Sequence, residues 1–503
     1  MIELKRVVTV FLVIIWLLSL SSLNGSRFFA LAEPRTWVVG TVDEERPVDF
    51  TSIQAAIDNA SSGDTVQVYS GNYREKIEIS KSIFLVGEDR DLTIISNDAA
   101  DSLISIRADK VTFKNFTIRK TIMGASGIGI QILSGYNVIS QNKILGIQDG
   151  ILIYSYSSNT ISDNIVSFNT NTGVSIYFSS GNFLSNNLIS DNYQGISISF
   201  SGNNVFSENT VSNNSVGVII FPNSNNNVFY HNNFLDNASP ASTTGSVNVW
   251  DSGGEGNYWS AYRGHDDGKD GIGDIAYSID VANRDNKPLM GMFYSFPAAF
   301  AHESFFVTII SNSSVTDFRF ETGVETGNQI ISFNVDGEDG TTGFSRIGIP
   351  VRLMNYSLIL VGGEETSPYA VDKPDKSYKY LYFTYAQSLQ TVTIISSKTI
   401  NMYNELLDKY NMTQTDLQNL NETYLDLLDN YTDFLNEYSQ LQQNYNALNS
   451  SYYAHLLDYD QNLENMRNLM YIFAAATAVL IVTTIYLSKR AHTRSTEKGE
   501  GGK

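Results

Sequence analysis

The residues best suited to acid–base chemistry are two carboxylates and an imidazole at matching positions of a repeat. Asp163, Glu208 and His231 share a column with Gln141 and Asn186, and each stands directly before an asparagine. A glycoside hydrolase needs two carboxylates about 5 to 9.5 Å apart, depending on the stereochemical outcome. Two repeats separate Asp163 from Glu208, which is roughly 10 Å at the usual strand spacing. Because the neighbouring positions are amides, a solvated turn column is the alternative, and the pattern favours a chain without hydrolase activity.

A second group of carboxylates lies in the acidic loop from residue 266 to residue 274. Asp266, Asp270 and Asp274 stand at relative positions 1, 5 and 9, with glycine at position 6, as in part of a calcium loop. Positions 3 and 12 lack the acids of such a loop, although Asp267 or Asp280 could compensate. We therefore expect a structural calcium ion here, with a simple Asp/Gly turn as the alternative.

Three aromatic residues form a candidate sugar-binding surface. Tyr154 and Tyr177 occupy equivalent positions in adjacent repeats, and Phe221 lies two repeats further on. Strand alternation directs the preceding Ile153 and Ile176 inward, so the rings face outward. Exposed rings beside Asn and Ser can pack on the apolar faces of sugars. The alternative is a ladder of rings that stack only on one another.

Charge and composition exclude several functions. The 503 residues carry 33 Lys+Arg against 53 Asp+Glu, a net charge of −20. Nucleic-acid binding relies on Lys and Arg at phosphates, so we expect no nucleic-acid partner. The chain has no cysteine, which excludes disulfides, thiolate metal ligands and cysteine nucleophiles.

A repeat of 22 to 23 residues must position these groups. Its glycines each open a short apolar alternation and stand at Gly127, Gly150, Gly173, Gly195 and Gly217. One asparagine column contains Asn137, Asn159, Asn182, Asn204 and Asn227, and another contains Asn142, Asn164, Asn187, Asn209 and Asn232. Three short strands per repeat match one coil of a parallel β-helix, and the leucine pattern of a leucine-rich repeat is absent. Stacked asparagines can then hydrogen-bond up each column.

The start and end of this region resemble a known family. Ser52-Ile-Gln-Ala-Ala-Ile predicts a short amphipathic helix with Ser52 as N-cap, which would cover the open first coil. This passage, with Gly71-Asn-Tyr73 and Leu85-Val-Gly87, resembles the start of pectin-lyase-like β-helix proteins. The Asn-rich coils and Gly256-Asn-Tyr-Trp-Ser through Pro288-Leu-Met are similar to the NosD-like family, over roughly residues 36 to 290.

The resemblance implies a right-handed parallel β-helix of the carbohydrate-binding and sugar-hydrolysing type, often described as periplasmic and copper-binding. Similar modules are common on archaeal surface proteins with a C-terminal anchor. Copper sites use Cys, Met or clustered His, but this chain has no cysteine and only five histidines. We therefore do not expect copper, and calcium is the only cofactor that the sequence predicts.

The distal half changes character. Residues 298–398 contain longer alternating strands separated by turn clusters, which predict a small antiparallel β-sandwich. From Tyr403 to Tyr459 tyrosines recur at seven-residue steps, with Leu417 filling one gap and Leu or Phe three residues after most of them. This heptad pattern predicts a coiled-coil stalk that could form a homo-oligomer, with a lone helix as the alternative.

The ends of the chain indicate export and membrane anchoring. Lys5 and Arg6 precede an apolar run, and Ala30-Leu31-Ala32 offers a cleavage site, although an uncleaved anchor is the alternative. Residues 469–487 carry no charge and are long enough to span a bilayer, and Lys489 and Arg490 follow at once. By the positive-inside rule the C-terminal tail is cytoplasmic and the large N-terminal region is extracellular.

Export makes the Asn-x-Ser/Thr sequons possible glycosylation sites. They begin at Asn59, Asn115, Asn213, Asn237, Asn312, Asn355, Asn411, Asn421, Asn430 and Asn449.

The expected fold class is therefore mainly β, with two folded modules, a stalk and a membrane span. Its parts are a signal peptide (1–32), the β-helix with its NosD-like closing motif (33–297), the β-sandwich (298–398), the coiled-coil stalk (400–468), the transmembrane helix (469–487) and a basic cytoplasmic tail (488–503). We expect a single-pass cell-surface glycoprotein whose β-helix binds polysaccharide or serves an adhesive, envelope-structural role. The alternative is a polysaccharide lyase, hydrolase or epimerase that uses the acidic turn column.

Overall fold

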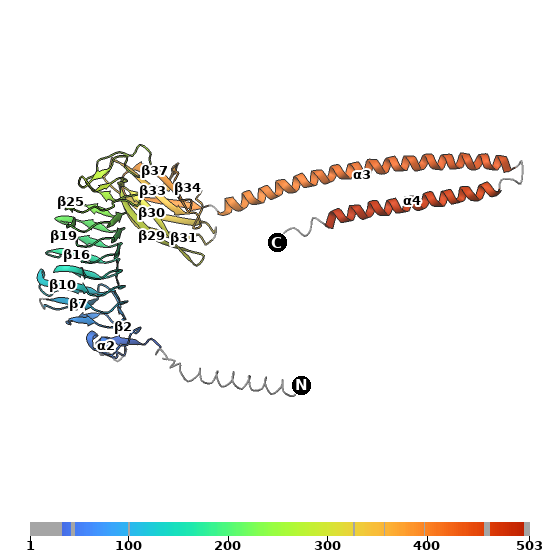
Figure 1. Ribbon diagram of the computed structural model, residues 1–503. Helices are drawn as coiled ribbons and strands as arrows, with labels where there is room; N and C mark the ends of the chain where they lie inside the picture. The colour runs from blue at the N-terminus through green and yellow to red at the C-terminus, as the bar shows by residue number, and fades with distance from the viewer. Residues whose placement is uncertain are drawn as a thin grey trace, which may run out of the picture. The chain divides into compact units, whose positions relative to one another are not determined.

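The computed structural model describes residues 33–41, 46–98, 101–324, 327–356, 358–396, 398–456 and 463–496. The chain forms two compact units, the first ending at Thr399 and the second beginning at Ile400 (Figure 1). The predicted signal peptide lies outside the described residues.

The first unit begins with a parallel β-helix of about eight coils, which confirms the predicted fold class. Each regular coil contributes one strand to each of three parallel sheets. The first sheet contains β1 (Thr36–Val39), β2 (Thr65–Val68), β5 (Phe84–Gly87), β8 (Thr112–Lys114), β11 (Val138–Ser140), β14 (Thr160–Ser162), β17 (Phe183–Ser185), β20 (Val205–Ser207) and β23 (Val228–Tyr230). The second contains β3 (Gly71–Tyr73), β6 (Thr93–Ser96), β9 (Thr117–Arg119), β12 (Lys143–Leu145), β15 (Ile165–Ser167), β18 (Leu188–Ser190), β21 (Thr210–Ser212), β24 (Asn233–Leu235) and β26 (Tyr258–Trp259). The third contains β4 (Ile77–Ile79), β7 (Ser102–Ile106), β10 (Ala125–Ile132), β13 (Ile147–Tyr154), β16 (Thr172–Tyr177), β19 (Gln194–Ser199), β22 (Val216–Ile220) and β25 (Ser239–Thr243).

In-register stacking builds the core of the β-helix. In the third sheet Ile151 pairs with Val174, which pairs with Ile196, and all three are buried. The same alternation buries the central apolar residue of the regular short strands in the other two sheets, such as Ile161 and Val166. Aliphatic columns therefore fill the interior, and the strand alternation turns Ser, Thr and Asn outward between them.

Buried asparagines form hydrogen-bonded ladders at the corners between sheets. In the corner before the second sheet, Oδ1 of Asn187 accepts both the backbone N–H and the Nδ2 group of Asn164, each at 3.0 Å. The Nδ2 group of Asn187 donates in turn to Oδ1 of Asn209 at 2.9 Å and to the carbonyl of Ile161 at 2.8 Å. The corresponding bonds link Asn137 to Asn248 before the first sheet. Both predicted asparagine columns are therefore confirmed as ladders.

The structure adds a third ladder that the sequence analysis missed. Asn169, Asn192, Asn214 and Asn237 are buried at the corner before the third sheet and are linked in the same way. Their spacing of 22 to 23 residues was visible in the sequence, but the preceding coil has Ile147 at this position and hides the column.

Except before Asn248 and Asn257, which end their columns, the residue that precedes each laddered asparagine has a left-handed backbone. The value of φ is +58° at Asp163, +54° at Asn186 and +60° at Glu208, and the other corners repeat this conformation. Asn, Asp and Gly tolerate this region best. The backbone conformation at this corner therefore favours polar residues there, independently of any chemical role.

A helix covers the N-terminal end of the solenoid, as predicted. The helix α2 (Ile53–Asn59) buries Ile53, Ala56 and Ile57 against the first coils, and Ser52 is its N-cap. The carboxylate of Glu75 accepts the N–H groups of Ile53 and Gln54, each at 3.0 Å, which satisfies two donors that the helix itself leaves open.

The NosD-like closing passage ends the ladders at the other end. Oδ2 of Asp285 accepts the N–H of Asn257 at 2.7 Å and the indole N–H of Trp259 at 2.9 Å. Gly256 is required beside it, because a Cβ there would lie 1.9 Å from Oδ1 of Asp285. Asp285 belongs to the short pair β27 (Tyr277–Ser278) and β28 (Arg284–Asp285). The passage is therefore the C-terminal cap of the β-helix.

Two antiparallel sheets follow the cap and share one apolar core. One sheet contains β29 (Met292–Phe300), β30 (Glu303–Ser311), β33 (Thr342–Pro350), β37 (Tyr378–Ala386) and β36 (Tyr369–Val371). The other contains β31 (Ser314–Thr322), β32 (Gln329–Asp336), β38 (Gln390–Ser396), β34 (Leu358–Val361) and β35 (Glu364–Glu365). The first strand of this module begins at Met292, inside the range predicted for the β-helix.

The second unit contains two long helices, α3 (Lys398–Leu456) and α4 (Leu463–Thr496). The described heptad residues of α3, including Tyr424 and Tyr431, are exposed, so the predicted coiled coil stays a prediction. Within α4, Met470–Lys489 has a mean hydropathy of 2.0 and is long and apolar enough to cross a membrane. The last seven residues of the predicted cytoplasmic tail lie outside the described residues.

We predict that Asn187→Ala lowers the free energy of unfolding by about 3 kcal/mol, because it leaves two buried donors of Asn164 without an acceptor. Asn186→Gly is the matched control, since Asn186 is exposed and glycine accepts its left-handed backbone. Chemical denaturation of both variants measures the difference. Equal stabilities would show that the ladder contributes little.

Candidate functional site

The three residues predicted for acid–base chemistry contact different partners. Oδ1 of Asp163 accepts the Nδ2 group of Asn186 at 2.5 Å. Glu208 lines a cleft of about 330 Å³ beside β29. The His231 ring stacks on Phe293 with 3.9 Å between centroids, and its Nε2 lies 2.8 Å from Oε2 of Glu255. The sandwich module therefore packs over His231, while the two carboxylates remain half-exposed on the corner.

A buried charged cluster that the sequence analysis missed joins the β-helix to the sandwich. Besides His231, the carboxylate of Glu255 binds Nη1 of the fully buried Arg346 at 2.6 Å and the amine of Lys373. Arg346 and Lys373 also lie over the ring of Tyr380. Burial alone would raise the pKa of Glu255, but the charges and hydrogen bonds of Arg346 and His231 outweigh it and hold this pKa well below its usual range.

Asn233 also joins the two modules, through two uncharged hydrogen bonds. Oδ1 of Asn233 accepts the backbone N–H of Phe293 at 2.8 Å, and its Nδ2 group donates to the carbonyl of Phe293 at 2.9 Å. Ile272 and Leu289 from the cap also pack with Phe344 and Tyr382 of the sandwich. These contacts fix β29 beside the corner that carries Glu208.

Asp285 is another buried carboxylate of this region. It is fully buried and accepts N–H groups of Asn257 and Trp259 and the backbone N–H of Lys287, and it forms no ion pair with a described residue. Burial raises its pKa to about 6, although the hydrogen bonds from Trp259 and from the backbone oppose this effect. Asp285 is thus a titrating group at the end of the ladder.

The predicted aromatic residues belong to a larger exposed patch at the end of the third sheet. The rings of Tyr154 and Tyr177 stack with 5.6 Å between centroids, and Tyr154 is 41% exposed. Phe178 and Phe200, which the sequence analysis missed, extend this stack in the next column and stack on each other at 4.9 Å. Phe221 follows in the next coil and is also exposed. We call these five residues the aromatic patch.

Two members of the aromatic patch adopt a backbone conformation that is unfavourable for bulky side chains. The value of φ is +50° at Phe178 and +49° at Phe200, where an L-residue other than Gly, Asn or Asp costs roughly 1–2 kcal/mol. Both side chains remain nearly half exposed, so burial does not explain the choice of phenylalanine.

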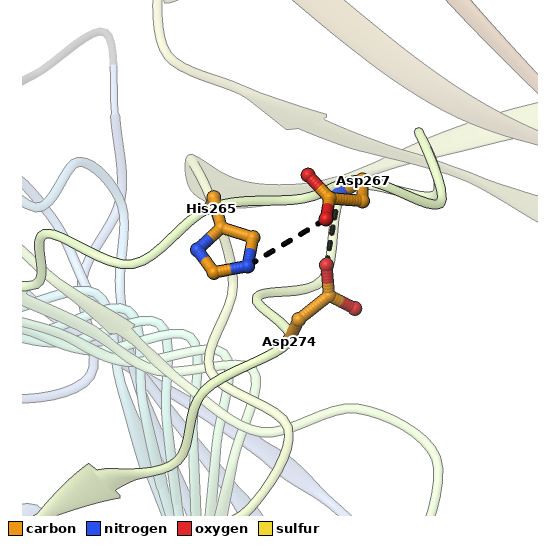
Figure 2. A group of neighbouring side chains, drawn as sticks. All are labelled: His265, Asp267 and Asp274. Carbon is orange, nitrogen blue, oxygen red and sulfur yellow. Dashed lines mark hydrogen bonds and ion pairs between the residues drawn. The ribbon is translucent and has the colours of Figure 1, made fainter.

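The acidic loop arranges its carboxylates differently from the predicted calcium set. Asp266 accepts the N–H groups of Asp270 and Gly271, and Asp270 accepts that of Ile272. Figure 2 shows His265, Asp267 and Asp274 turned toward one another. One ligand atom of each lies within 4.8 Å of those of the other two. Of the predicted set, only Asp274 belongs to this exposed group, and calcium binding stays a prediction.

Most described sequon asparagines are accessible, with one clear exception. Asn59, Asn213, Asn312 and Asn355 are exposed, as are Asn411, Asn421 and Asn430 on α3, and Asn115 is half-buried. The side chain of Asn449 lies outside the described residues. Asn237 is buried in the third ladder, where its Nδ2 group donates to the carbonyl of Val211 at 2.7 Å. A glycan on Asn237 is therefore incompatible with the folded coil, which corrects this prediction.

Comparison with protein families matches residues 57–264 to the family described as "Periplasmic copper-binding protein (NosD)". The matched segment lies within the parallel β-helix and its closing passage, so this part of the chain is similar to that family, as the sequence resemblance implied. The residues do not fit copper: the one cluster of possible ligands in the described part has a single His and two Asp, whereas copper favours Cys, Met or clustered His. None of the curated proteins is a match.

Similar solved structures include carbohydrate-active proteins and a tailspike. Pectin methylesterase from Erwinia chrysanthemi is 13% identical, with a TM-score of 0.27 over 36% of this chain and 79% of that chain. The A-module of a mannuronan C-5 epimerase from Azotobacter vinelandii is 15% identical, with a TM-score of 0.26 over 39% and 76%. The Dettilon tailspike protein is 11% identical, with a TM-score of 0.28 over 68% and 89%.

The raised pKa of Asp285 predicts the direction in which the free energy of unfolding changes with pH. Because the folded state binds this proton more tightly than the unfolded chain, the contribution is complete below about pH 4 and is lost as the pH rises through about 6. The two-unit shift corresponds to about 3 kcal/mol. Asp285→Asn removes this titration. Between pH 4 and pH 7 the free energy of unfolding of the natural chain should therefore fall by about 3 kcal/mol more than that of the variant.

Denaturation curves of the two proteins at several pH values measure this difference. Parallel pH profiles would show that Asp285 does not titrate in this range.

Proposed function

We propose that the protein is a membrane-anchored surface protein whose β-helix binds polysaccharide through the aromatic patch, in an adhesive or envelope-structural role. The observation that carries the proposal is the patch itself, in which exposed rings gather on coils otherwise rich in Ser, Thr and Asn. Large exposed apolar patches on soluble modules mark binding surfaces.

The geometry of the patch defines how a sugar would contact it. Tyr154 and Tyr177 cover part of each other's faces, so the available surface consists of ring edges, the two hydroxyls and the exposed parts of Phe178 and Phe200. Neighbouring strands of the solenoid lie about 4.8 Å apart. A linear polymer that runs along the solenoid axis would therefore meet an aromatic contact on successive coils.

The membrane part of the proposal is supported by the apolar segment Met470–Lys489. The following Lys and Arg residues favour a cytoplasmic C-terminus and an external β-helix. The heptad tyrosines of α3 offer a seam through which copies of the chain could associate.

We predict that Tyr154→Ala combined with Tyr177→Ala lowers the affinity for a retained polysaccharide at least tenfold, because the stacked pair of rings and its two hydroxyls are lost. Retention of the full chain, in detergent, is measured on immobilised polysaccharides. Tyr193→Ala is the matched control, since Tyr193 is exposed at the opposite end of a third-sheet strand. Unchanged retention in the double variant would rule out the patch, and new products from a bound polymer would instead indicate an enzyme.

We further predict that a chain ending at Asn468 leaves the membrane fraction, because it lacks the apolar segment. Carbonate washing of membranes from cells that express each form separates anchored from peripheral protein. Removal of residues 488–503 alone is the control and should leave the chain in the membrane. A shortened chain that still resists the wash would contradict anchoring by α4.

A further inference from the structure

The cleft beside Glu208 is formed where the sandwich module lies against the β-helix. One wall consists of residues from successive coils, including Asn186, Glu208 and Thr210, and the other is the start of β29, from Met292 to Phe296. Asn233 holds the two walls together by its pair of hydrogen bonds with Phe293. The volume of about 330 Å³ falls at the lower end of the range for small-molecule sites.

The lining combines hydroxyl-binding groups with apolar side chains. Glu208 supplies a half-exposed carboxylate, Asn186 an amide and Thr210 a hydroxyl, while Leu235 and Met292 supply apolar surface. Tyr294 and Phe296 also line the cleft, but their rings pack against the core of the sandwich, where Phe296 stacks on Phe318 with 4.5 Å between centroids. A carboxylate, an amide and a hydroxyl beside apolar side chains suit a sugar, which has hydroxyl donors and apolar ring faces.

The charge of the cleft restricts which sugars it accepts. None of the described lining residues is Lys or Arg, and Asp163 lies one coil beyond Asn186, to which it is bonded. The field of Glu208 extends to Tyr378, whose pKa is raised first by burial and then by Asp375 and Glu208. A uronate carboxylate here would meet like charge without a compensating cation, which costs binding free energy.

We propose that this cleft binds one uncharged sugar residue of a neutral polysaccharide and discriminates against polyuronates through Glu208. This inference rests on the proposed glycan-binding function and specifies its ligand class. The carboxylate of Glu208 accepts hydroxyl hydrogen bonds from the neutral sugar, and the same charge repels an acidic one. Glu208 is thus the specificity residue, and the docked sandwich completes the site.

The test compares neutral and acidic polymers on the full chain in detergent, with EDTA present to remove bridging cations. The probes are dextran, mannan and galactan as neutral polymers, and polygalacturonate and alginate as polyuronates. We expect at least one neutral polymer to bind at least tenfold more tightly than either polyuronate. Preference for a polyuronate would overturn the inference.

The variant Glu208→Gln keeps the size and removes the charge. It should lower the affinity for the neutral polymer about tenfold, because charge-assisted hydrogen bonds are lost. It should also reduce the ratio of the affinity for the neutral polymer to the affinity for polyuronates. Asp191→Asn is the matched control, since Asp191 is an acidic, left-handed corner residue outside the cleft lining, and it should change neither value. Unchanged binding and discrimination in Glu208→Gln would overturn the inference.

The outcomes also separate this inference from the proposed function. If binding depends on Tyr154 and Tyr177 but is indifferent to Glu208, the aromatic patch binds glycan and the cleft does not. If none of these polymers is retained, both proposals fail.

Discussion

The ladder of buried asparagine amides is the interaction on which the rest of this structure depends. A laddered Oδ1 atom accepts two N–H groups from the preceding coil, and the Nδ2 group donates onward to the next. A missing amide would leave buried donors without partners, which is costly in a dry interior. The spacing of 22 to 23 residues is therefore fixed coil by coil, and the outward-facing side chains inherit that regular spacing.

A ladder that donates in one direction needs an acceptor where it ends. The column before the second sheet ends on the carboxylate of Asp285, and the column before the first sheet reaches Asn283 through the N–H of Asn248. Gly256 lets the chain approach Asp285 closely enough for this contact. The closing passage thus accepts the last N–H groups of both columns, although the Nδ2 group of Asn248 is buried without an acceptor among the described residues. The carboxylate that ends the second column is buried as a consequence, and burial raises its pKa.

The sequence predicts the periodic part of this fold because periodicity is visible in one dimension. Two asparagine columns, the covering helix and the apolar segment near the C-terminus were all evident from spacing. The contacts between modules were not, since Arg346 lies 91 residues from Glu255. Its strand β33 is buried along nearly its whole length, so it shows no polar–apolar alternation. Phe178 and Phe200 were missed because a left-handed backbone has no signature when the residue is aromatic.

The sandwich packs against the β-helix in such a way that equivalent residues of the repeat lie in different environments. His231 and Glu208 occupy the same corner in adjacent coils, yet the sandwich packs over the first and leaves the second beside an open cleft. Along one coil, eight residues separate Phe200 in the aromatic patch from Glu208, a path of at most about 29 Å. A single sugar is too small to contact both, whereas a polysaccharide that follows the aromatic patch along the solenoid axis is long enough to reach the cleft with one end. A rigid, ladder-spaced surface with two separate contact points therefore favours an extended polysaccharide over a small ligand.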